Sequence, residues 1–124
     1  MDSPTNKQVF ISYVEEDSEV VNVISAAIEK LCVKTWYYQR DSLPGLSYLV
    51  QIGRAIDAAD AIVLVASKLS LASNQVTKEV IRGHESAKPF VPVLLDVTHR
   101  EFQARPEWRE AIGAASSISA AVHT

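Results

Sequence analysis

The stretch from Ala61 to Glu79 constrains the fold of this chain more than any other. It opens with six consecutive apolar residues, Ala61 to Ala66, which is typical of a β-strand buried on both faces of a sheet. The run breaks at Ser67, and after a short polar loop a helical pattern carries Glu79 in its second turn. A strand followed by a helix predicts a parallel sheet and places a carboxylate near the carboxyl edge of that sheet.

The same alternation of strand and helix runs through the rest of the chain. It predicts an α/β fold with a flavodoxin-like, doubly wound parallel sheet, strand order 2-1-3-4-5 and helices on both faces. Pro92 cannot donate to a strand ladder, which predicts a bulge or a position near the sheet edge. The predicted strands are Gln8 to Tyr13, Val33 to Tyr38, Ala61 to Ala66, Phe90 to Leu95 and a very short one at Ser117 to Ser119.

Apolar residues at helical spacing predict the helices between these strands. An acidic turn, Glu15 to Asp17, suits the start of the first helix. A further helix is predicted at Glu107 to Ala115, after Pro106. The predicted inward faces are Val20, Ile24, Ala27, Ile28 and Leu31 in the first helix, Leu49, Ile52, Ile56 and Ala59 in the second, and Val76, Val80 and Ile81 in the third.

Glu79 is the residue on which a functional prediction depends. Most glutamates on helices are solvated, and Lys78 or Arg82 would offer such a glutamate an ion pair. However, Glu79 lies at the margin of the apolar stripe formed by Val76 and Val80, and its helix follows the strand at the topological switch point. Ligands bind in sheets of this kind at the switch point, outside the carboxyl ends of the strands.

Composition narrows the possible classes of function. The 124 residues fit one domain, predicted over residues 8–124 after a flexible start at residues 1–7. The net charge of −3 and the scattered basic residues argue against a basic stripe that would bind nucleic acid. The sequence lacks an apolar run long enough for a membrane span and a signal-peptide pattern, and its single cysteine, Cys32, favours a reducing compartment. We therefore expect a cytoplasmic domain with no nucleic-acid or membrane partner.

Other site motifs are missing from the sequence. The three histidines, His84, His99 and His123, show no ligand spacing, so no metal is expected. No serine or cysteine lies in a nucleophile motif, and there is no GxGxxG loop. A retained dinucleotide cofactor is therefore disfavoured.

Three segments in order resemble a Toll/interleukin-1 receptor (TIR) domain of the bacterial type. They are FISY followed by an acidic turn and Asp17, TWYYQRD leading to Pro-Gly, and IVLVAS with Glu79 twelve residues beyond Ser67. The resemblance covers Gln8 to about Asp96. It implies the flavodoxin-like fold already argued, and it makes Glu79 the catalytic glutamate that cleaves NAD at its nicotinamide glycosidic bond, so that NAD is a substrate and not a cofactor.

The resemblance also implies a set of site residues. Gln39 to Leu46 becomes the mobile loop after the second strand, which serves substrate access and self-association. Family members that cleave NAD often carry Trp four residues before the glutamate, where this chain has Gln75, and Tyr13 or Tyr38 is the candidate replacement for that ring. The expected substrate-binding residues are Ser12, Tyr13, Arg40, Ser67 and Gln75, and the expected self-association residues are Asp41, Leu43, Pro44 and Gly45.

Alternative roles remain for several of these residues. Ser12 and Ser67 are equally well explained as residues that end strands. Arg40 and Asp41 suit a phosphate, a neighbouring subunit or a solvated loop pair.

Four candidate functions are consistent with these residues and with the resemblance, and two of them are favoured. The first is an NAD glycohydrolase that releases nicotinamide with ADP-ribose or a cyclic relative, activated by self-association with other TIR domains and a fused or separate sensor. Antiphage defence is the role that the resemblance implies for it. The second is a non-catalytic adaptor that only assembles with like domains. A phospho-receiver needs an aspartate where this chain has Ser67, and a nucleoside deoxyribosyltransferase is the remaining alternative.

Overall fold

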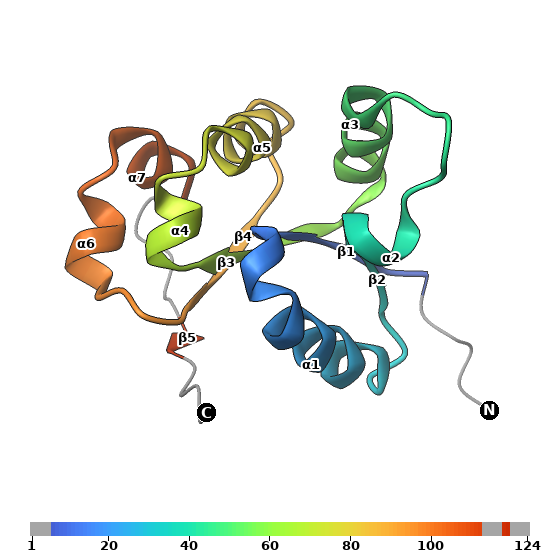
Figure 1. Ribbon diagram of the computed structural model, residues 1–124, viewed down its shortest axis with the longest axis horizontal. Coiled ribbons are helices and arrows are strands. Elements are labelled where there is room, and N and C mark those ends of the chain that lie inside the picture. The colour runs from blue at the N-terminus through green and yellow to red at the C-terminus, as the bar shows by residue number, and fades with distance from the viewer. Residues whose placement is uncertain (1–5, 113–117, 120–124) are drawn as a thin grey trace.

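A five-stranded parallel sheet forms the centre of the molecule, with strand order β2-β1-β3-β4-β5 (Figure 1). The computed structural model describes residues 6–112 and 118–119. The predicted fold class and strand order are confirmed. The strands are β1 (Gln8–Ser12), β2 (Lys34–Trp36), β3 (Ala61–Ala66), β4 (Phe90–Leu94) and β5 (Ile118–Ser119).

Helices cover both faces of the sheet, as predicted. Helix α1 lies on one face, and α3, α5 and α7 lie on the other (Figure 1). The helices are η1 (Glu15–Asp17), α1 (Ser18–Glu29), α2 (Tyr38–Asp41), α3 (Tyr48–Ala58), α4 (Lys68–Leu71), α5 (Asn74–Glu85), α6 (His99–Gln103) and α7 (Pro106–Ile112).

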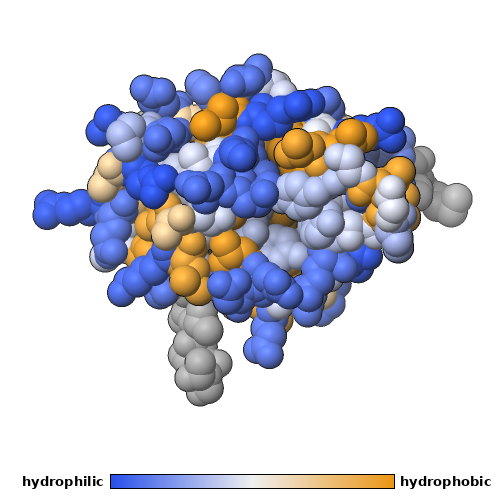
Figure 2. All heavy atoms as spheres, turned by 45° about the horizontal axis from the view of Figure 1, so that its top comes forward, coloured by the Kyte–Doolittle hydropathy of each residue, from blue (hydrophilic) through white to orange (hydrophobic). Residues whose placement is uncertain are grey.

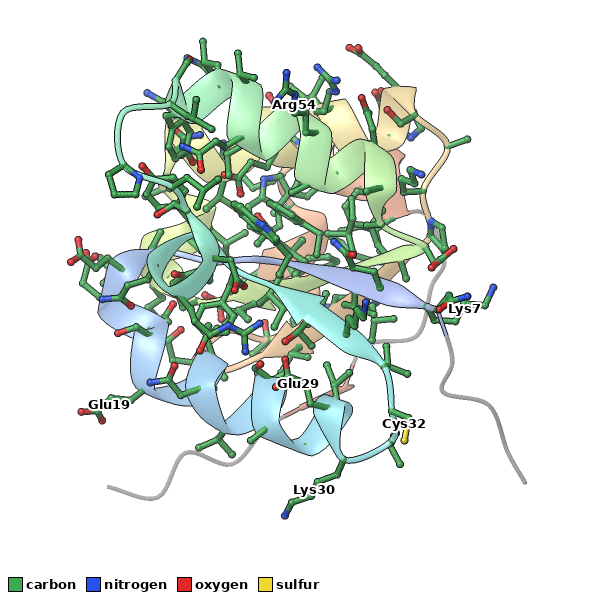
Figure 3. The ribbon with its side chains drawn as sticks, turned by 90° about the vertical axis from the view of Figure 1, so that its right-hand side faces the viewer. Lys7, Glu19, Glu29, Lys30, Cys32 and Arg54 are labelled. Atoms are coloured by element: carbon green, nitrogen blue, oxygen red, sulfur yellow. The ribbon has the colours of Figure 1, made fainter. Side chains whose placement is uncertain are left out.

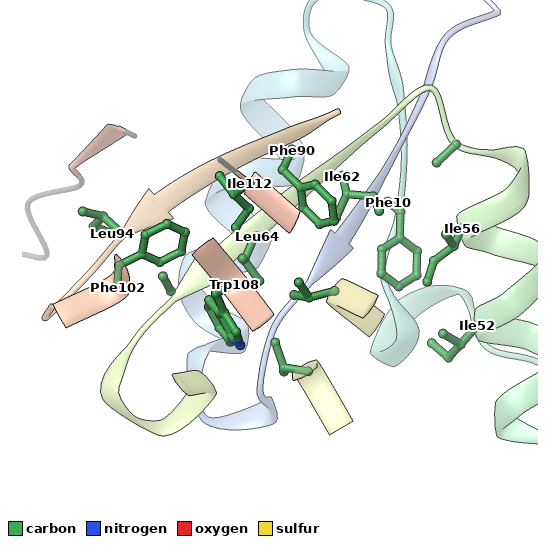
Figure 4. Packing of buried hydrophobic residues seen from close by; sticks show 14 of the residues in the cluster. Phe10, Ile52, Ile56, Ile62, Leu64, Phe90, Leu94, Phe102, Trp108 and Ile112 are labelled. Atoms are coloured by element: carbon green, nitrogen blue, oxygen red, sulfur yellow. The ribbon is translucent and has the colours of Figure 1, made fainter. Parts of the chain in front are cut away.

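The buried apolar side chains form one core on each face of the sheet. The larger core joins the sheet to α3, α5 and α7, and its aromatic rings Phe102 and Trp108 meet edge to face at 5.7 Å between centroids (Figure 4). The smaller core places Ile11, Val63 and Val65 against Val21 of α1. Because both faces of β3 are covered, its sequence is apolar without interruption.

Several predicted inward positions are wrong. Leu31 and Leu49 are exposed, at 74% and 71%, and Ile81 is 39% exposed. In α1, Ile24 and Ile28 pack partly buried against the smaller core as predicted, but Val21 rather than Val20 is fully buried, and Ala27 is exposed. The apolar periodicity of α1 does not separate these two positions, because it carries β-branched residues at both Val20 and Val21.

Connections in the sheet are more helical than the sequence predicts. Tyr38, expected at the end of a strand, begins the single turn α2, and the short helix α4 occupies the loop predicted after Ser67. Helix α6 lies in a segment for which no element was predicted. Pro92 lies in register with Leu64 inside β4, and β4 borders the edge strand β5. Helix α7 confirms the helix predicted near Trp108, and residues 113–117, which include Ser117, lie outside the described residues.

On the face that Figure 2 shows, most residues are polar and the hydrophobic residues form separate patches. Within residues 6–112 and 118–119, no helix combines the length and apolarity needed to cross a bilayer.

Candidate active site

Glu79 is a buried carboxylate beside the carboxyl end of β1. It lies in the second turn of α5, whose N-terminus is capped by the Ser73 hydroxyl accepting from the Val76 amide. Val76 and Val80 anchor this helix in the core with about 1% or less of their surface exposed, and Glu79 between them is only 6% exposed. The amphipathic pattern of α5 thus carries Glu79 inward with the apolar stripe.

Two hydroxyl groups from distant segments hold the carboxylate. Ser12, the last residue of β1, donates to Glu79 Oε1 at 2.6 Å. Tyr48, the first residue of α3, donates to Oε2 at 2.7 Å, and the Gln75 amide donates to the same oxygen at 3.4 Å. Burial raises the pKa of Glu79, while these hydrogen bonds lower it and so favour the charged form.

A cavity of about 640 Å³ opens beside this carboxylate. Its walls come from the carboxyl end of β1, the acidic turn after it, α2 and the N-terminal turns of α3 and α5. The residues that line it are Phe10, Ile11, Tyr13, Val14, Glu15, Glu16, Tyr38, Gln39, Ser42, Tyr48, Ile52, Leu69, Ser73, Gln75 and Glu79.

The predicted site residues are only partly brought together. Tyr13 and Gln75 line the cavity with Glu79, and Ser12 contacts Glu79 directly. Ser67 lies elsewhere: its hydroxyl donates to Asp17 Oδ2 at 2.6 Å and accepts from the Ser70 amide, which caps α4. Ser67 is therefore placed as a capping residue that joins β3 to the acidic turn.

Asp17 is a second partly buried acid in this region. Burial raises its pKa, and the hydrogen bond from Ser67 lowers it. The negative charges of Asp96 and Glu16 raise it further.

Arg40 is bound within the chain. Its Nε and Nη2 donate to the two carboxylate oxygens of Asp41, each at 2.9 Å, and its Nη1 donates to Glu29 at 2.9 Å. Nη2 also donates to the Thr35 carbonyl at 2.6 Å, and the guanidinium carbon lies 4.6 Å from the centre of the Tyr37 ring. Glu29 lies on the side of α1 toward β2 (Figure 3). Arg40 and Asp41 thus fasten α2 to α1 and β2.

Three tyrosines form the aromatic wall of the cavity. The Tyr38 and Tyr48 rings meet at 4.8 Å between centroids, and the Tyr13 hydroxyl accepts from the Gln39 amide at 3.1 Å. Burial and the negative charge of Glu79 raise the pKa of Tyr48. Tyr48 is not among the site residues predicted from the sequence. The signal that identifies it is its spacing of four residues to Ile52 and eight to Ile56, which places it on the inward face of α3.

The loop after α2 contains the predicted turn. Gly45 has φ +83°, and the Leu46 amide donates to the Leu43 carbonyl at 3.4 Å, which fits a type II turn with glycine at its third position. Gln51 ties the loop to α3, accepting from the Leu43 amide at 2.6 Å and donating to the carbonyls of Leu43 and Leu46 at 3.1 Å. The turn exposes Leu43 (61%) and Leu46 (48%).

The site contains no ready metal centre. No group of three or more His, Cys, Asp or Glu side chains suited to a metal ion occurs in the described part of the chain. The groups that the site does present are the Glu79 carboxylate with its hydroxyl donors, a wall of tyrosines, and the acids Glu15 and Glu16.

Comparisons with known proteins agree with this architecture. A family model described as TIR domain matches residues 9–120. No curated protein matches the sequence.

Solved structures of TIR domains share the fold. The TIR domains of the activated Roq1 resistosome align with a TM-score of 0.72 at 22% identity, over 86% of this chain and 68% of theirs. The TIR domain of the Toll-related receptor TRR-2 from Hydra magnipapillata aligns with a TM-score of 0.68 at 23% identity, over 90% and 82%.

A TIR-STING receptor from C. gigas, in complex with 2′,3′-cGAMP, aligns with a TM-score of 0.73 at 25% identity. The match spans 98% of this chain but only 37% of the receptor. Because the family model covers most of the sequence and the fold agrees with these structures, the chain belongs to the TIR domain family.

Proposed function

We propose that this domain is an NAD glycohydrolase that cleaves the bond between nicotinamide and ribose. The observation that carries the proposal is the Glu79 carboxylate, 6% exposed, held by two hydroxyl groups and forming part of the wall of a cavity of about 640 Å³. A buried carboxyl group with a perturbed pKa in a cleft is a recurrent feature of catalytic sites.

One carboxylate is sufficient for this reaction. The pyridinium nitrogen takes the electron pair of the breaking C1′–N bond, so nicotinamide leaves as a neutral molecule without a general acid. Positive charge develops on the ribose as the bond lengthens, and the Glu79 carboxylate stabilises it. Water then adds to C1′ and releases a proton to the solvent, which gives ADP-ribose. Attack by a group of the same nucleotide gives a cyclic product instead.

The surroundings of Glu79 fit this role. The carboxylate must be ionised to stabilise the ribose, and the donors Ser12, Tyr48 and Gln75 oppose the effect of burial on its pKa. The carboxylate also has further lone pairs, so it can accept from the ribose hydroxyls of the substrate.

Tyrosines supply the aromatic surface that Gln75 lacks. Tyr13, Tyr38 and Tyr48 all line the cavity, so a ring of the nucleotide can stack on this wall. This arrangement supports Tyr13 and Tyr38 as replacements for the expected Trp.

The test is release of nicotinamide by the purified, concentrated protein, measured by chromatography. We expect Glu79→Gln, which keeps the shape of the side chain, to reduce the rate by about 10²- to 10³-fold. The matched control is Glu85→Gln, which removes an exposed acid from the same helix and should leave the rate unchanged. Equal slow release by the wild type and Glu79→Gln would refute the proposal.

Assembly through the loop after α2 is the second candidate function. The exposed Leu43 and Leu46 favour it, and the absence of Trp at Gln75 is consistent with an adaptor. The TIR domains of Roq1 belong to an activated resistosome that recognises a pathogen effector. By analogy we propose an immune role with self-association as the trigger. Light scattering that finds only monomer at high concentration, with and without NAD, would argue against assembly.

A further inference from the structure

The carboxylate of Glu79 has no intrinsic preference for one orientation of its plane. The last torsion of a glutamate side chain is broad and roughly two-fold, so only the contacts of the carboxylate oppose its rotation. Val76 and Val80 are buried on either side of Glu79 in α5, but apolar neighbours do not distinguish one carboxylate oxygen from the other. The plane of the carboxylate is therefore set by its hydrogen-bond donors.

Ser12 and Tyr48 bind opposite oxygens of this carboxylate. Ser12 donates to Oε1 at 2.6 Å from the end of β1, and Tyr48 donates to Oε2 at 2.7 Å from the start of α3. The Gln75 amide lies 3.4 Å from Oε2, which is long for a hydrogen bond, so its contact is the weaker one. Without the Tyr48 hydroxyl, the carboxylate of Glu79 could pivot about its single strong bond to Ser12.

Tyr48 differs from Ser12 in its place relative to the cavity. Ser12 is 1% exposed and is not among the residues that line the cavity, so it holds the carboxylate from the core. Tyr48 lines the cavity, and its ring packs on Tyr38 at 4.8 Å between centroids. Helix α3 is itself anchored in the core through Ile52 and Ile56 (Figure 4). The Tyr48 hydroxyl is thus a fixed donor at the wall of the cavity.

A tyrosine holds the carboxylate without neutralising its charge. No lysine, arginine or histidine is among the described residues that line the cavity. The titratable groups that line it with Glu79 are three tyrosines and two exposed acids, namely Tyr13, Tyr38, Tyr48, Glu15 and Glu16. An ionised Glu79 therefore keeps its net negative charge for a cation that enters the cavity.

The charged side chains around α5 are engaged away from Glu79. Arg82 pairs with Asp57 of α3 at 2.9 Å, and Arg105, just before α7, donates to the last carbonyl of α4. Lys78 is exposed. The charged form of Glu79 thus depends on neutral donors, of which Tyr48 is the one with a strong bond at the cavity wall.

We propose that Tyr48 is a positioning residue for the cleavage reaction, whose hydroxyl fixes the plane of the Glu79 carboxylate and keeps that carboxylate charged. This inference rests on the proposed glycohydrolase function and adds a residue to it. Burial and the negative charge of Glu79 raise the pKa of Tyr48, so its hydroxyl keeps its proton. Tyr48 therefore donates a hydrogen bond throughout the reaction and transfers no proton.

The experiment measures nicotinamide release from NAD by the full chain carrying Tyr48→Phe, across a range of pH and well below the melting temperature of the variant. The variant keeps the ring on the cavity wall, so KM for NAD should change little. We expect kcat at the optimum pH to fall about 10-fold or more, because misplacing a reacting group by about 1 Å costs up to 10²-fold. A loss in kcat with KM unchanged marks an interaction that acts in the transition state.

The pH profile supplies a readout that a merely structural role would not move. The Tyr48 bond favours the charged form of Glu79, so its loss should raise the midpoint of the acidic limb by about one pH unit. Tyr48→3-fluorotyrosine has a more acidic phenol and donates a stronger hydrogen bond, so it should lower that midpoint and keep kcat near the wild-type value. This second variant leaves the fold intact and tests the bond in the opposite direction.

Tyr37→Phe is the matched control. It removes another hydrogen-bonded hydroxyl, which donates to Asn22 at 2.9 Å, from a tyrosine that is 7% exposed and does not line the cavity. We expect its kcat and its acidic limb to match those of the wild type. Equal changes in Tyr37→Phe and Tyr48→Phe, or no change in Tyr48→Phe, would overturn the inference.

A titration without substrate separates this inference from the chemistry. The carboxyl carbon of Glu79, labelled with carbon-13 and assigned by its loss in Glu79→Gln, should titrate at higher pH in Tyr48→Phe than in the wild type. If the wild type releases no nicotinamide, the glycohydrolase proposal fails, and Tyr48 has no reaction to serve. If the wild type cleaves NAD and Tyr48→Phe changes neither kcat nor this titration, only the role of Tyr48 fails.

Discussion

Removing the Tyr48 hydroxyl tests whether the buried carboxylate depends on its donors. Tyr48→Phe keeps the ring against Tyr38 and leaves Glu79 Oε2 with only the Gln75 amide at 3.4 Å. A hydrogen bond to a charged group contributes about 1.5–3 kcal/mol. With an unfolding entropy of about 2.1 cal/mol/K per residue, a chain of 124 residues should lose about 6–12 °C in Tm at pH 8.

The assay is thermal unfolding followed by circular dichroism in a series of buffers from pH 8 downwards. Glu79 has a raised pKa, so it takes up a proton at a higher pH than an ordinary glutamate. Once it is neutral, the Tyr48 bond joins two neutral groups and is worth about 0.5–1.5 kcal/mol. The loss of Tm should therefore become smaller as the pH falls through the raised pKa of Glu79.

Tyr38→Phe is the matched control. It removes a hydroxyl from the ring that packs on Tyr48, and that ring makes no hydrogen bond to Glu79 within the described residues. We expect its Tm to stay within about 2 °C of the wild type, as for most substitutions away from buried networks. Equal losses in the two variants, or a Tyr48→Phe loss that does not change with pH, would refute the role of the hydroxyl.

Three further perturbations have expected outcomes. Nicotinamide release should decline as pH falls through the raised pKa of Glu79, because the protonated carboxyl group no longer stabilises the ribose cation. Since burial favours the protonated form in the folded state, the stability that this form contributes at low pH is lost as pH rises through that pKa. Glu79→Gln, which stays neutral, should therefore melt above the wild type at pH 8. Gly83→Ala should destabilise by about 1–3 kcal/mol in urea, because its Cβ would clash with side chains of β3 and β4, whereas Gly53→Ala meets only a flexible arginine and should be neutral or stabilising. Arg40→Lys should cost about 1 kcal/mol by losing a bidentate pair, and Arg54→Lys, at an exposed position on α3, nothing measurable (Figure 3).

The fold was predictable because its signals are strong and local. The apolar run of β3 is long enough, and the inward pair Val76 and Val80 is periodic enough, that each predicts a single element and a single buried face. Gly45 takes the positive φ that the predicted turn requires. The ends of the helices and strands were predicted less accurately. Single helical turns such as α2 and α4 are too short to show a period, so the sequence gives no pattern for them.

The site was only half predictable for a different reason. Glu79 follows from helix phase and topology, which the sequence encodes locally. Its partners depend on how β1, α3 and α5 approach one another, and nothing near Tyr48 in the sequence indicates an acid 31 residues away. Arg40 shows the opposite case. An arginine in a loop suggests a site for a bound anion, but the guanidinium of Arg40 is paired with the carboxylates of Glu29 and Asp41 in the same chain.

The carboxylate of Glu79 joins three segments of the chain. It accepts hydrogen bonds from one hydroxyl that lies 67 residues before it and from another that lies 31 residues before it. No proteolytic fragment that lacks one of these segments retains the arrangement. Loss of turnover on heating should therefore coincide with the cooperative melting of the whole domain, so enzymatic assay and spectroscopy would trace a single curve.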